Sequence, residues 1–192
     1  MKITFKKLLY LIALVCFSFC AKAQQYAVPD TIRYSIGLDG EFPSGNLTNS
    51  YSYGLGISAQ IDVPLSPKWY FTGNIGFESF FPDGYSGNNP EAIQGLKVSN
   101  FDVAPIKVGI KYFLIRTFYL QAEAGEAVLV DKSSVYGLHS FAPVFAPQLG
   151  LLFKLHHKNY IDAGFRYEWL QSFYGDGQYN KYFALRIAYG IN

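Results

Sequence analysis

The residues best suited to chemistry in this sequence are a histidine and the serine that follows it. His139 directly precedes Ser140, and a histidine activates a serine hydroxyl when an acidic side chain orients the ring. Glu126 and Asp131 are the acids that would serve. Adjacent residues of an extended segment point to opposite sides, so the pair is poorly placed for proton transfer. We therefore expect a loop here and no catalytic residues.

The other two histidines, His156 and His157, stand beside Lys158 in a short connection. A metal site needs several His, Cys, Asp or Glu ligands, and no further ligand clusters nearby in sequence. We predict a solvated turn, with no metal and no other cofactor. Cys16 and Cys20 both precede residue 24, so disulfides and thiol chemistry are not expected in the rest of the chain.

The N-terminus has the three-part layout of a secretory signal peptide. A basic start leads into an apolar run of twelve residues, 8–19, and Ala21-Lys22-Ala23 supplies the small residues of a cleavage site. The run is shorter than the roughly 20 residues of a spanning helix. We predict removal of residues 1–23, followed by a short lead over 24–32. Lipid attachment at Cys20 is the alternative, but no small residue precedes it.

Removal of that segment would change the net charge. The full chain has 16 basic and 14 acidic residues, and its first 23 residues contain four lysines and no acid. The mature chain would have 12 basic and 14 acidic residues, so the formal charge would fall from +2 to −2. The basic balance therefore gives no reason to expect nucleic acid as a partner.

From residue 33 onward, apolar and polar residues alternate with period two in eight segments, which predicts eight strands. Short connections are expected at 64–68, 115–117 and 156–159, and longer ones at 43–50, 82–100, 131–142 and 174–180. Transmembrane barrels have short periplasmic turns and longer outer loops. The predicted fold is all-β: an eight-stranded, antiparallel, up-and-down transmembrane β-barrel over 33–192.

The polar face is expected to line the lumen because it is rich in glycine and serine, which suit a narrow barrel. It also carries six bases and seven acids, a near balance that favours pairing inside a closed lumen. The predicted lumen network comprises Arg33, Asp39, Glu41, Asp62, Glu78, Lys107, Lys111, Glu123, Lys154, Asp162, Arg166, Glu168 and Arg186. So many polar groups predict a packed core in preference to a pore.

Aromatic residues gather near the strand ends, as in the two interface belts of a membrane barrel. The predicted interface residues are Tyr51, Tyr53, Trp69, Tyr112, Tyr160 and Trp169, with Phe80, Phe81 and Phe173 near the long loops. A soluble barrel would place the apolar face inside. It is disfavoured because the face rich in glycine and serine suits the narrow interior of an eight-stranded barrel. That leaves the apolar face outside, where it would aggregate in water but suits a membrane.

The signal peptide, the hairpin rhythm and segments such as Ala104-Pro-Ile-Lys-Val-Gly-Ile-Lys-Tyr-Phe113 resemble the small outer-membrane β-barrel families of OmpA, OmpX and PorT-like type. The resemblance covers the mature chain, and it is specific for fold and weak for function. It implies an outer-membrane location, with lipid, lipopolysaccharide and the barrel-assembly machinery as partners. The ending Tyr189-Gly190-Ile191-Asn192 departs from the pattern because it lacks a terminal aromatic residue.

Three functions stay open at this point. The preferred one is a non-enzymatic barrel with a structural role, or a role as a surface protein or envelope-complex subunit acting through its outer loops. The second follows from the resemblance, since some small outer-membrane barrels are lipid A deacylases or acyltransferases; it would use His139 and Ser140. The third is a narrow passive channel.

Overall fold

The computed structural model of the chain describes residues 31–82, 100–130, 139–155, 158–174 and 177–191. The predicted signal peptide, most of the lead that follows it and most of the longest outer loop lie outside these ranges. So do Asp131, His156 and His157. None of the helices in the described ranges has the length and apolar character needed to span a bilayer.

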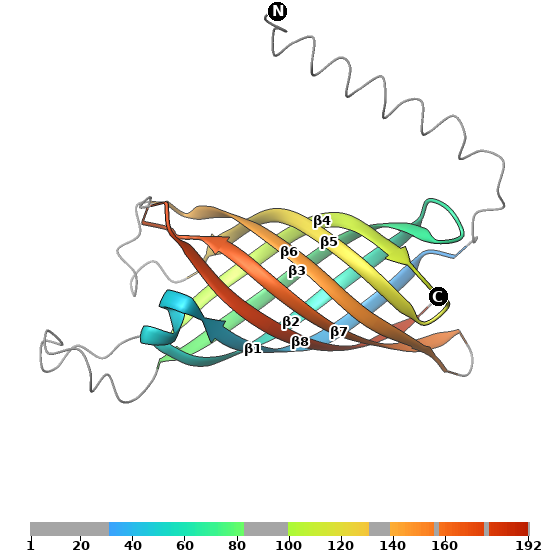
Figure 1. Cartoon of the computed structure of the whole chain (residues 1–192), viewed down its shortest axis with the longest axis horizontal. Helices are drawn as coiled ribbons and strands as arrows, with labels where there is room; N and C mark the ends of the chain where they lie inside the picture. Colours follow the sequence, from blue (N-terminus) through green and yellow to red (C-terminus); the bar gives the residue numbers. More distant parts are fainter. Residues whose placement is uncertain (1–30, 83–99, 131–138, 156–157, 175–176, 192) are drawn as a thin grey trace, which may run out of the picture.

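Eight antiparallel strands form a closed barrel in chain order, with β8 hydrogen-bonded to β1 (Figure 1). The strands are β1 (Arg33–Ser44), β2 (Tyr51–Pro64), β3 (Trp69–Pro82), β4 (Phe101–Phe113), β5 (Phe118–Leu129), β6 (Phe141–Lys154), β7 (Asn159–Gln171) and β8 (Tyr179–Ile191). A 3-10 helix, η2 (Gly45–Asn49), follows β1. The predicted fold class is confirmed, although β4 and β6 begin several residues earlier than the alternation indicated.

The connections divide the barrel into two unlike ends. The turns after β2, β4 and β6 lie at one end with the start of β1 and the end of β8, on the right in Figure 1. We call this the short-turn end. Helix η2 and the longer connections lie at the opposite, long-loop end. A strand of 13 residues at the usual barrel tilt rises roughly 30 Å along the axis, enough to cross the apolar part of a bilayer.

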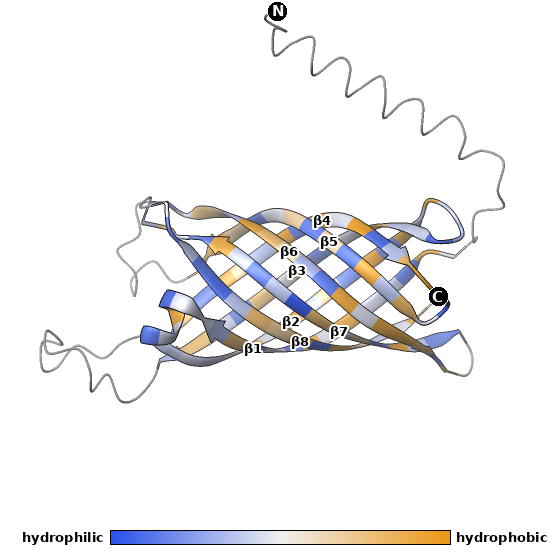
Figure 2. Cartoon of the chain, viewed as in Figure 1, coloured by the Kyte–Doolittle hydropathy of each residue, from blue (hydrophilic) through white to orange (hydrophobic). Residues whose placement is uncertain are grey.

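Hydrophilic and hydrophobic residues alternate along the strands (Figure 2), and the burial of their side chains alternates in step between the lumen and the outer surface. In β8, Leu185 and Ile187 are 51% and 67% exposed on the outside, whereas Ala184 and Arg186 are at most 1% exposed inside. Every strand carries exposed aliphatic or aromatic residues in this way. Such an exterior is the lipid-facing surface of a transmembrane barrel.

Large rings fit into the narrow lumen because glycines face them from the neighbouring strand. Phe80 pairs with Gly54, Tyr119 with Gly150, and Tyr160 with Gly190. A Cβ atom on Gly54 would lie 2.8 Å from Phe80 Cδ1, and one on Gly150 or Gly190 would overlap the facing tyrosine ring. An eight-stranded lumen has room only for its own side chains, so each ring occupies space that a glycine leaves.

Two of the predicted interface aromatics are wrong, because they turn inward. Tyr160 is 1% exposed and shares the lumen side of β7 with Asp162. Alternate residues of a strand face the same side, so Tyr160 faces the lumen although tyrosine usually favours membrane interfaces. Tyr51 is displaced by an irregularity in the β2–β3 register between Tyr51 and Tyr53, and it packs on the buried ring of Phe101.

The other four predicted interface aromatics lie on the outer face. Near the short-turn end, Trp69 packs on Tyr112 of the next strand with ring centroids 4.5 Å apart. Towards the long-loop end, Tyr53 stacks on Phe81 at 5.0 Å, and Trp169 is also directed outward from β7. The barrel therefore carries outward aromatic pairs near both ends, the arrangement that suits two membrane interfaces.

Candidate functional site

The middle of the lumen contains a buried group of charged side chains, which we call the lumen network. It consists of the acids Asp39, Glu41, Asp62, Glu78, Glu123, Asp162 and Glu168 and the bases Lys107, Lys111, Arg166 and Arg186. Each is 3% exposed or less. Seven acids against four bases give this buried group a formal charge of −3. The other two predicted members, Arg33 and Lys154, lie at the short-turn end, where both line the mouth of the lumen.

Glu168 is the centre of the part of the network nearer the long loops. Lys107 Nζ lies 2.7 Å from Glu168 Oε1 and 3.9 Å from Glu78 Oε1, and Arg166 Nε contacts the same oxygen of Glu168. The Tyr182 hydroxyl lies 2.7 Å from Glu78 Oε2 and 3.1 Å from Glu168 Oε2. These contacts connect β3, β4, β7 and β8 across the lumen.

Lys111 is the centre of the part nearer the short turns. Its ammonium lies 2.7 Å from Asp62 Oδ2 and 3.4 Å from Asp162 Oδ2, and 4.5 Å above the ring of Tyr119. The Tyr119 hydroxyl donates to Asp162 Oδ1 at 2.6 Å and accepts from Gln148 Nε2 at 2.6 Å. Lys111 is thus the cation that both aspartates share, and no other base of the described residues forms an ion pair with either.

Asp39 links the two arginines of the network. Arg166 Nη2 donates to Asp39 Oδ1 at 3.1 Å, and Ser58 Oγ donates to Asp39 Oδ2 at 2.6 Å. Arg186 Nε in turn donates to Ser58 Oγ at 3.0 Å. Both oxygens of this carboxylate are therefore satisfied, as buried polar groups require.

Glu41 differs from the other acids of the network. Both of its carboxyl oxygens are buried without a hydrogen-bond partner in the described structure. They lie against the backbone of Gly54 and Gly56, where an added Cβ would come within 2.8 Å of one or the other oxygen. The two glycines leave the space that this side chain occupies, and no hydrogen bond from a described residue holds it there.

An apolar cluster closes the lumen at the long-loop end, and we call it the outer cap. It contains Leu47, Phe80, Phe101, Val103, Ala127, Leu129, Ala142, Val144, Leu170, Phe173 and Tyr182. Leu47 comes from η2, which folds over the barrel end. Phe80 and Phe173 were expected in the outer aromatic belt, and that prediction is wrong: both are at most 1% exposed inside the barrel.

A second cluster, the inner cap, closes the lumen at the short-turn end. It contains Tyr70, Phe113, Tyr119, Leu152 and Tyr160, whose rings pack at centroid distances such as 5.5 Å between Tyr70 and Phe113. Beyond it, Arg33 lies over the rings of Tyr70 and Phe113. The lumen thus has a polar middle between two apolar ends.

The structure does not bring the candidate catalytic residues together. His139 is exposed, and Ser140 is half-buried beside it at the start of β6. Glu126 is exposed on the outer face of β5, and among the described residues no hydrogen bond joins any two of these side chains. Within the same ranges, no three His, Cys, Asp or Glu side chains are grouped to hold a metal ion.

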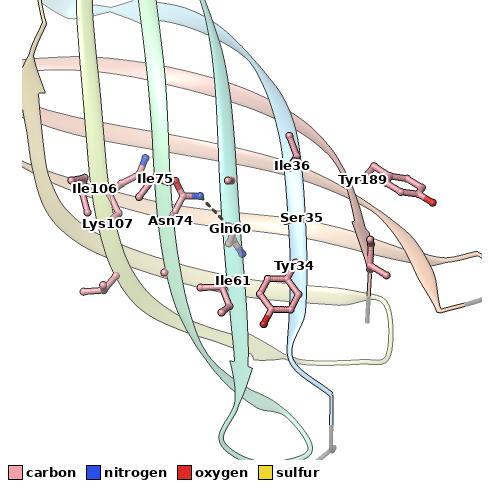
Figure 3. A pocket seen from close by; sticks show the side chains of 14 residues that line it. Tyr34, Ser35, Ile36, Gln60, Ile61, Asn74, Ile75, Ile106, Lys107 and Tyr189 are labelled. Atoms are coloured by element: carbon pink, nitrogen blue, oxygen red, sulfur yellow. Dashed lines mark hydrogen bonds between the residues drawn. The ribbon is translucent and has the colours of Figure 1, made fainter.

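One hollow of the described surface is an open groove of about 750 Å³ on the outside of β8, β1, β2, β3 and β4. Figure 3 shows Tyr34, Ile61 and Ile75 on its outer side, whereas the hydrogen bond from Asn74 to Gln60 belongs to the lumen. Its lining includes the small residues Ala59 and Gly73. Its apolar lining belongs to the lipid-facing surface, and it contains no group suited to catalysis.

A different hollow, of about 580 Å³, lies at the mouth of the barrel at the short-turn end. Four basic residues line it: Arg33, Lys68, Arg116 and Lys154. Its remaining lining is apolar or aromatic and includes the inner-cap residues Tyr70 and Phe113. No acid belongs to the lining.

Comparison with known protein families gave no match, and comparison with curated proteins gave none either. Among solved structures, the chain is similar to outer membrane protein Ail of Yersinia pestis, with 17% identity, TM-score 0.48, and coverage of 84% of this chain and 100% of that one. Neisserial surface protein A matches with 13% identity, TM-score 0.49, and 83% and 96% coverage. Outer membrane protein OprG of Pseudomonas aeruginosa matches with 10% identity, TM-score 0.49, and 84% and 95% coverage. The barrel assignment itself rests on the strand pairing described above.

Proposed function

We propose that this protein is a non-enzymatic outer-membrane β-barrel with a sealed lumen, which acts through its outer loops and conducts nothing. The signal-peptide pattern of the N-terminus and the apolar exterior of the barrel support an outer-membrane location. The short turns would then face the periplasm. The long-loop end would then serve contacts at the cell surface or with an envelope complex. Connections on a rigid barrel commonly carry such recognition.

The observation that carries this proposal is the filling of the lumen. The charged groups in its middle are buried and, with the exception of Glu41, engaged with polar or ionic partners, and an apolar cap lies on each side of them. An ion would have to break several buried pairs to pass, and unpaired charge in such an interior is strongly unfavourable. The same packing makes the barrel a rigid support for its connections.

Planar-bilayer recording tests the sealed lumen. The purified protein, inserted at a loading that gives many barrels per membrane, is expected to leave the baseline current unchanged in molar potassium chloride. Insertion is verified independently by the difference in gel migration between the unboiled and the boiled protein or by its protection from protease. Discrete, reproducible conductance steps from verified barrels would show an open path and overturn the proposal in favour of a passive channel.

A further inference from the structure

Basic residues at the short-turn end form a group that the proposed function does not use. Arg33, Lys68, Arg116, Lys154 and Lys158 lie at the start of β1 and in or beside the three short turns; we call them the basic collar. The short-turn segments 31–34, 65–68, 114–117 and 154–159 contain no acid. The longer connections, by contrast, contain four acids and two bases. In the sequence, the short and the longer connections therefore differ in the sign of their net charge.

The collar cations have no ionic partners within the described structure. Lys107, Lys111 and Arg166 of the lumen network all form ion pairs, whereas no residue of the collar forms one. Arg33 lies with its guanidinium carbon 4.5 Å from the centre of the Tyr70 ring, and its Nε and Nη1 donate no hydrogen bond. Among the described residues, no ion pair therefore compensates the charge of the collar.

Each part of the collar also carries an exposed aliphatic residue next to its base. Ile32 adjoins Arg33, Leu65 shares a turn with Lys68, and Ile115 adjoins Arg116. Leu155 is likewise exposed in the turn that contains Lys158. The outward pair Trp69–Tyr112 lies next to this end. Aliphatic and aromatic groups beside long basic side chains suit the headgroup boundary of a bilayer, where the cations reach phosphate and the apolar groups reach acyl chains.

We propose that the basic collar, with the 580 Å³ mouth that four of its residues line, is a binding site for the phosphate headgroups of anionic phospholipids in the leaflet on the short-turn side. The chemical group that the collar would bind is a phosphodiester beside an acyl chain. Lys68 and Arg116, which are exposed in their turns, meet the headgroups, and Arg33 on the inner cap supplies a further fixed charge at the mouth. The interleaved aliphatic residues favour lipid over a soluble anion. The site depends on the barrel lying in a bilayer and is independent of whether the lumen conducts.

The two tryptophans of the chain are built-in reporters of the two ends. Trp69 lies near the collar, and Trp169 lies towards the long loops. A Trp169→Phe variant and a Trp69→Phe variant each retain one of them. Each is reconstituted in phosphatidylcholine vesicles containing a small fraction of brominated lipid, either phosphatidylglycerol or phosphatidylcholine. Bromine quenches tryptophan at short range, so the ratio of the two quenching efficiencies measures local enrichment of the anionic lipid.

Near Trp69, we expect brominated phosphatidylglycerol to be enriched over brominated phosphatidylcholine. The expected enrichment is about fivefold for each collar base that binds the anionic lipid, because one base near an anionic surface usually contributes about that much. Lys68→Gln with Arg116→Gln should return the ratio towards one. Lys181→Gln, which removes a base from β8 at the opposite end, is the matched control and should leave the Trp69 ratio unchanged. The Trp169 ratio should be unchanged by Lys68→Gln with Arg116→Gln, because Trp169 lies towards the opposite end, beside Lys181.

A ratio of one at Trp69 in the barrel with an intact collar overturns the proposal, as does a preference that survives loss of Lys68 and Arg116. Inorganic phosphate, added at constant ionic strength, separates the two sources of phosphate. If the collar binds lipid, the Trp69 preference for phosphatidylglycerol should persist in the presence of millimolar phosphate. Loss of the Trp69 preference under that condition would assign the collar to a free anion and contradict the lipid proposal. None of these outcomes depends on the conductance recordings.

Discussion

Lys111 and Lys68 have the same side chain and lie in the same half of the barrel, yet their surroundings are opposite. The ammonium of Lys111 is fully buried between Asp62 and Asp162, whereas Lys68 is exposed in a turn and has no ionic partner among the described residues. The buried lysine helps to hold the strands together across the lumen. The exposed lysine adds nothing to the interior, so its charge is free for an external ligand.

This difference separates two uses of charge in one small barrel. Charges of the lumen network are buried and nearly all partnered, so their removal is expected to change stability. Charges of the basic collar are exposed or only half-buried and unpaired, so their removal is expected to change binding. The experiments below test that division with matched substitutions, in order of expected effect.

Lys111→Met is expected to have the largest effect. The substitution leaves Asp62 and Asp162 buried without their shared cation, in an interior that already has more acids than bases. Removal of one partner of a buried ion pair usually lowers the free energy of unfolding by about 3–5 kcal/mol. Urea unfolding of the barrel in lipid vesicles, followed by tryptophan fluorescence, measures the change.

Glu41→Gln is the control for that experiment, because this buried group has no partner to lose. It should change the free energy of unfolding by less than about 1 kcal/mol, in either direction. If Glu41→Gln destabilised the barrel as much as Lys111→Met, pairing would not be what distinguishes the members of the lumen network.

Gly150→Ala should have an intermediate effect. Its Cβ would overlap the Tyr119 ring, which donates from its hydroxyl to Asp162, so the substitution would displace part of the network as well as the inner cap. Overpacking of this kind usually costs about 1–3 kcal/mol. Gly40→Ala is the control, since nothing lies within 4 Å of the added Cβ. Equal unfolding midpoints for the two variants would show that the lumen is loosely packed.

Lys68→Met should have the smallest effect on stability, within about 0.5 kcal/mol of the unaltered protein in the same urea experiment. The side chain is exposed and makes no ion pair in the described structure. A loss comparable to that of Lys111→Met would mean that the collar holds the barrel together, and the distinction between the two groups of bases would fail.

The period-two alternation was sufficient to predict the strands, their number and their antiparallel order. It also predicted the lumen side of most positions, for example the inward direction of Asp162 and the outward direction of Ile161. The side to which each residue of a strand points alternates along the strand, so a single sequence is enough to predict it wherever the pairing is regular.

The ends of the lumen were harder to predict. Tyr160 and Phe80 were assigned to the outer face because aromatic residues favour membrane interfaces, although their positions continue the polar side of their strands. The facing glycines, Gly190 and Gly54, were the signal that was missed. Tyr51 could not be placed by parity, since the register irregularity depends on pairing with β3 and has no local signature in β2.

The most direct test of the sealed lumen is hydroxyl-radical footprinting of the tyrosines in lipid nanodiscs, followed by mass spectrometry of the peptides. Tyr119 and Tyr182 lie inside the barrel, Tyr174 is exposed at the long-loop end, and Tyr189 lies on the lipid-facing surface. We predict that Tyr174 is oxidised rapidly, whereas Tyr119 and Tyr182 are protected at least as well as lipid-covered Tyr189. Oxidation of Tyr119 and Tyr182 at the rate of Tyr174 would reveal a water-filled lumen and contradict the central claim.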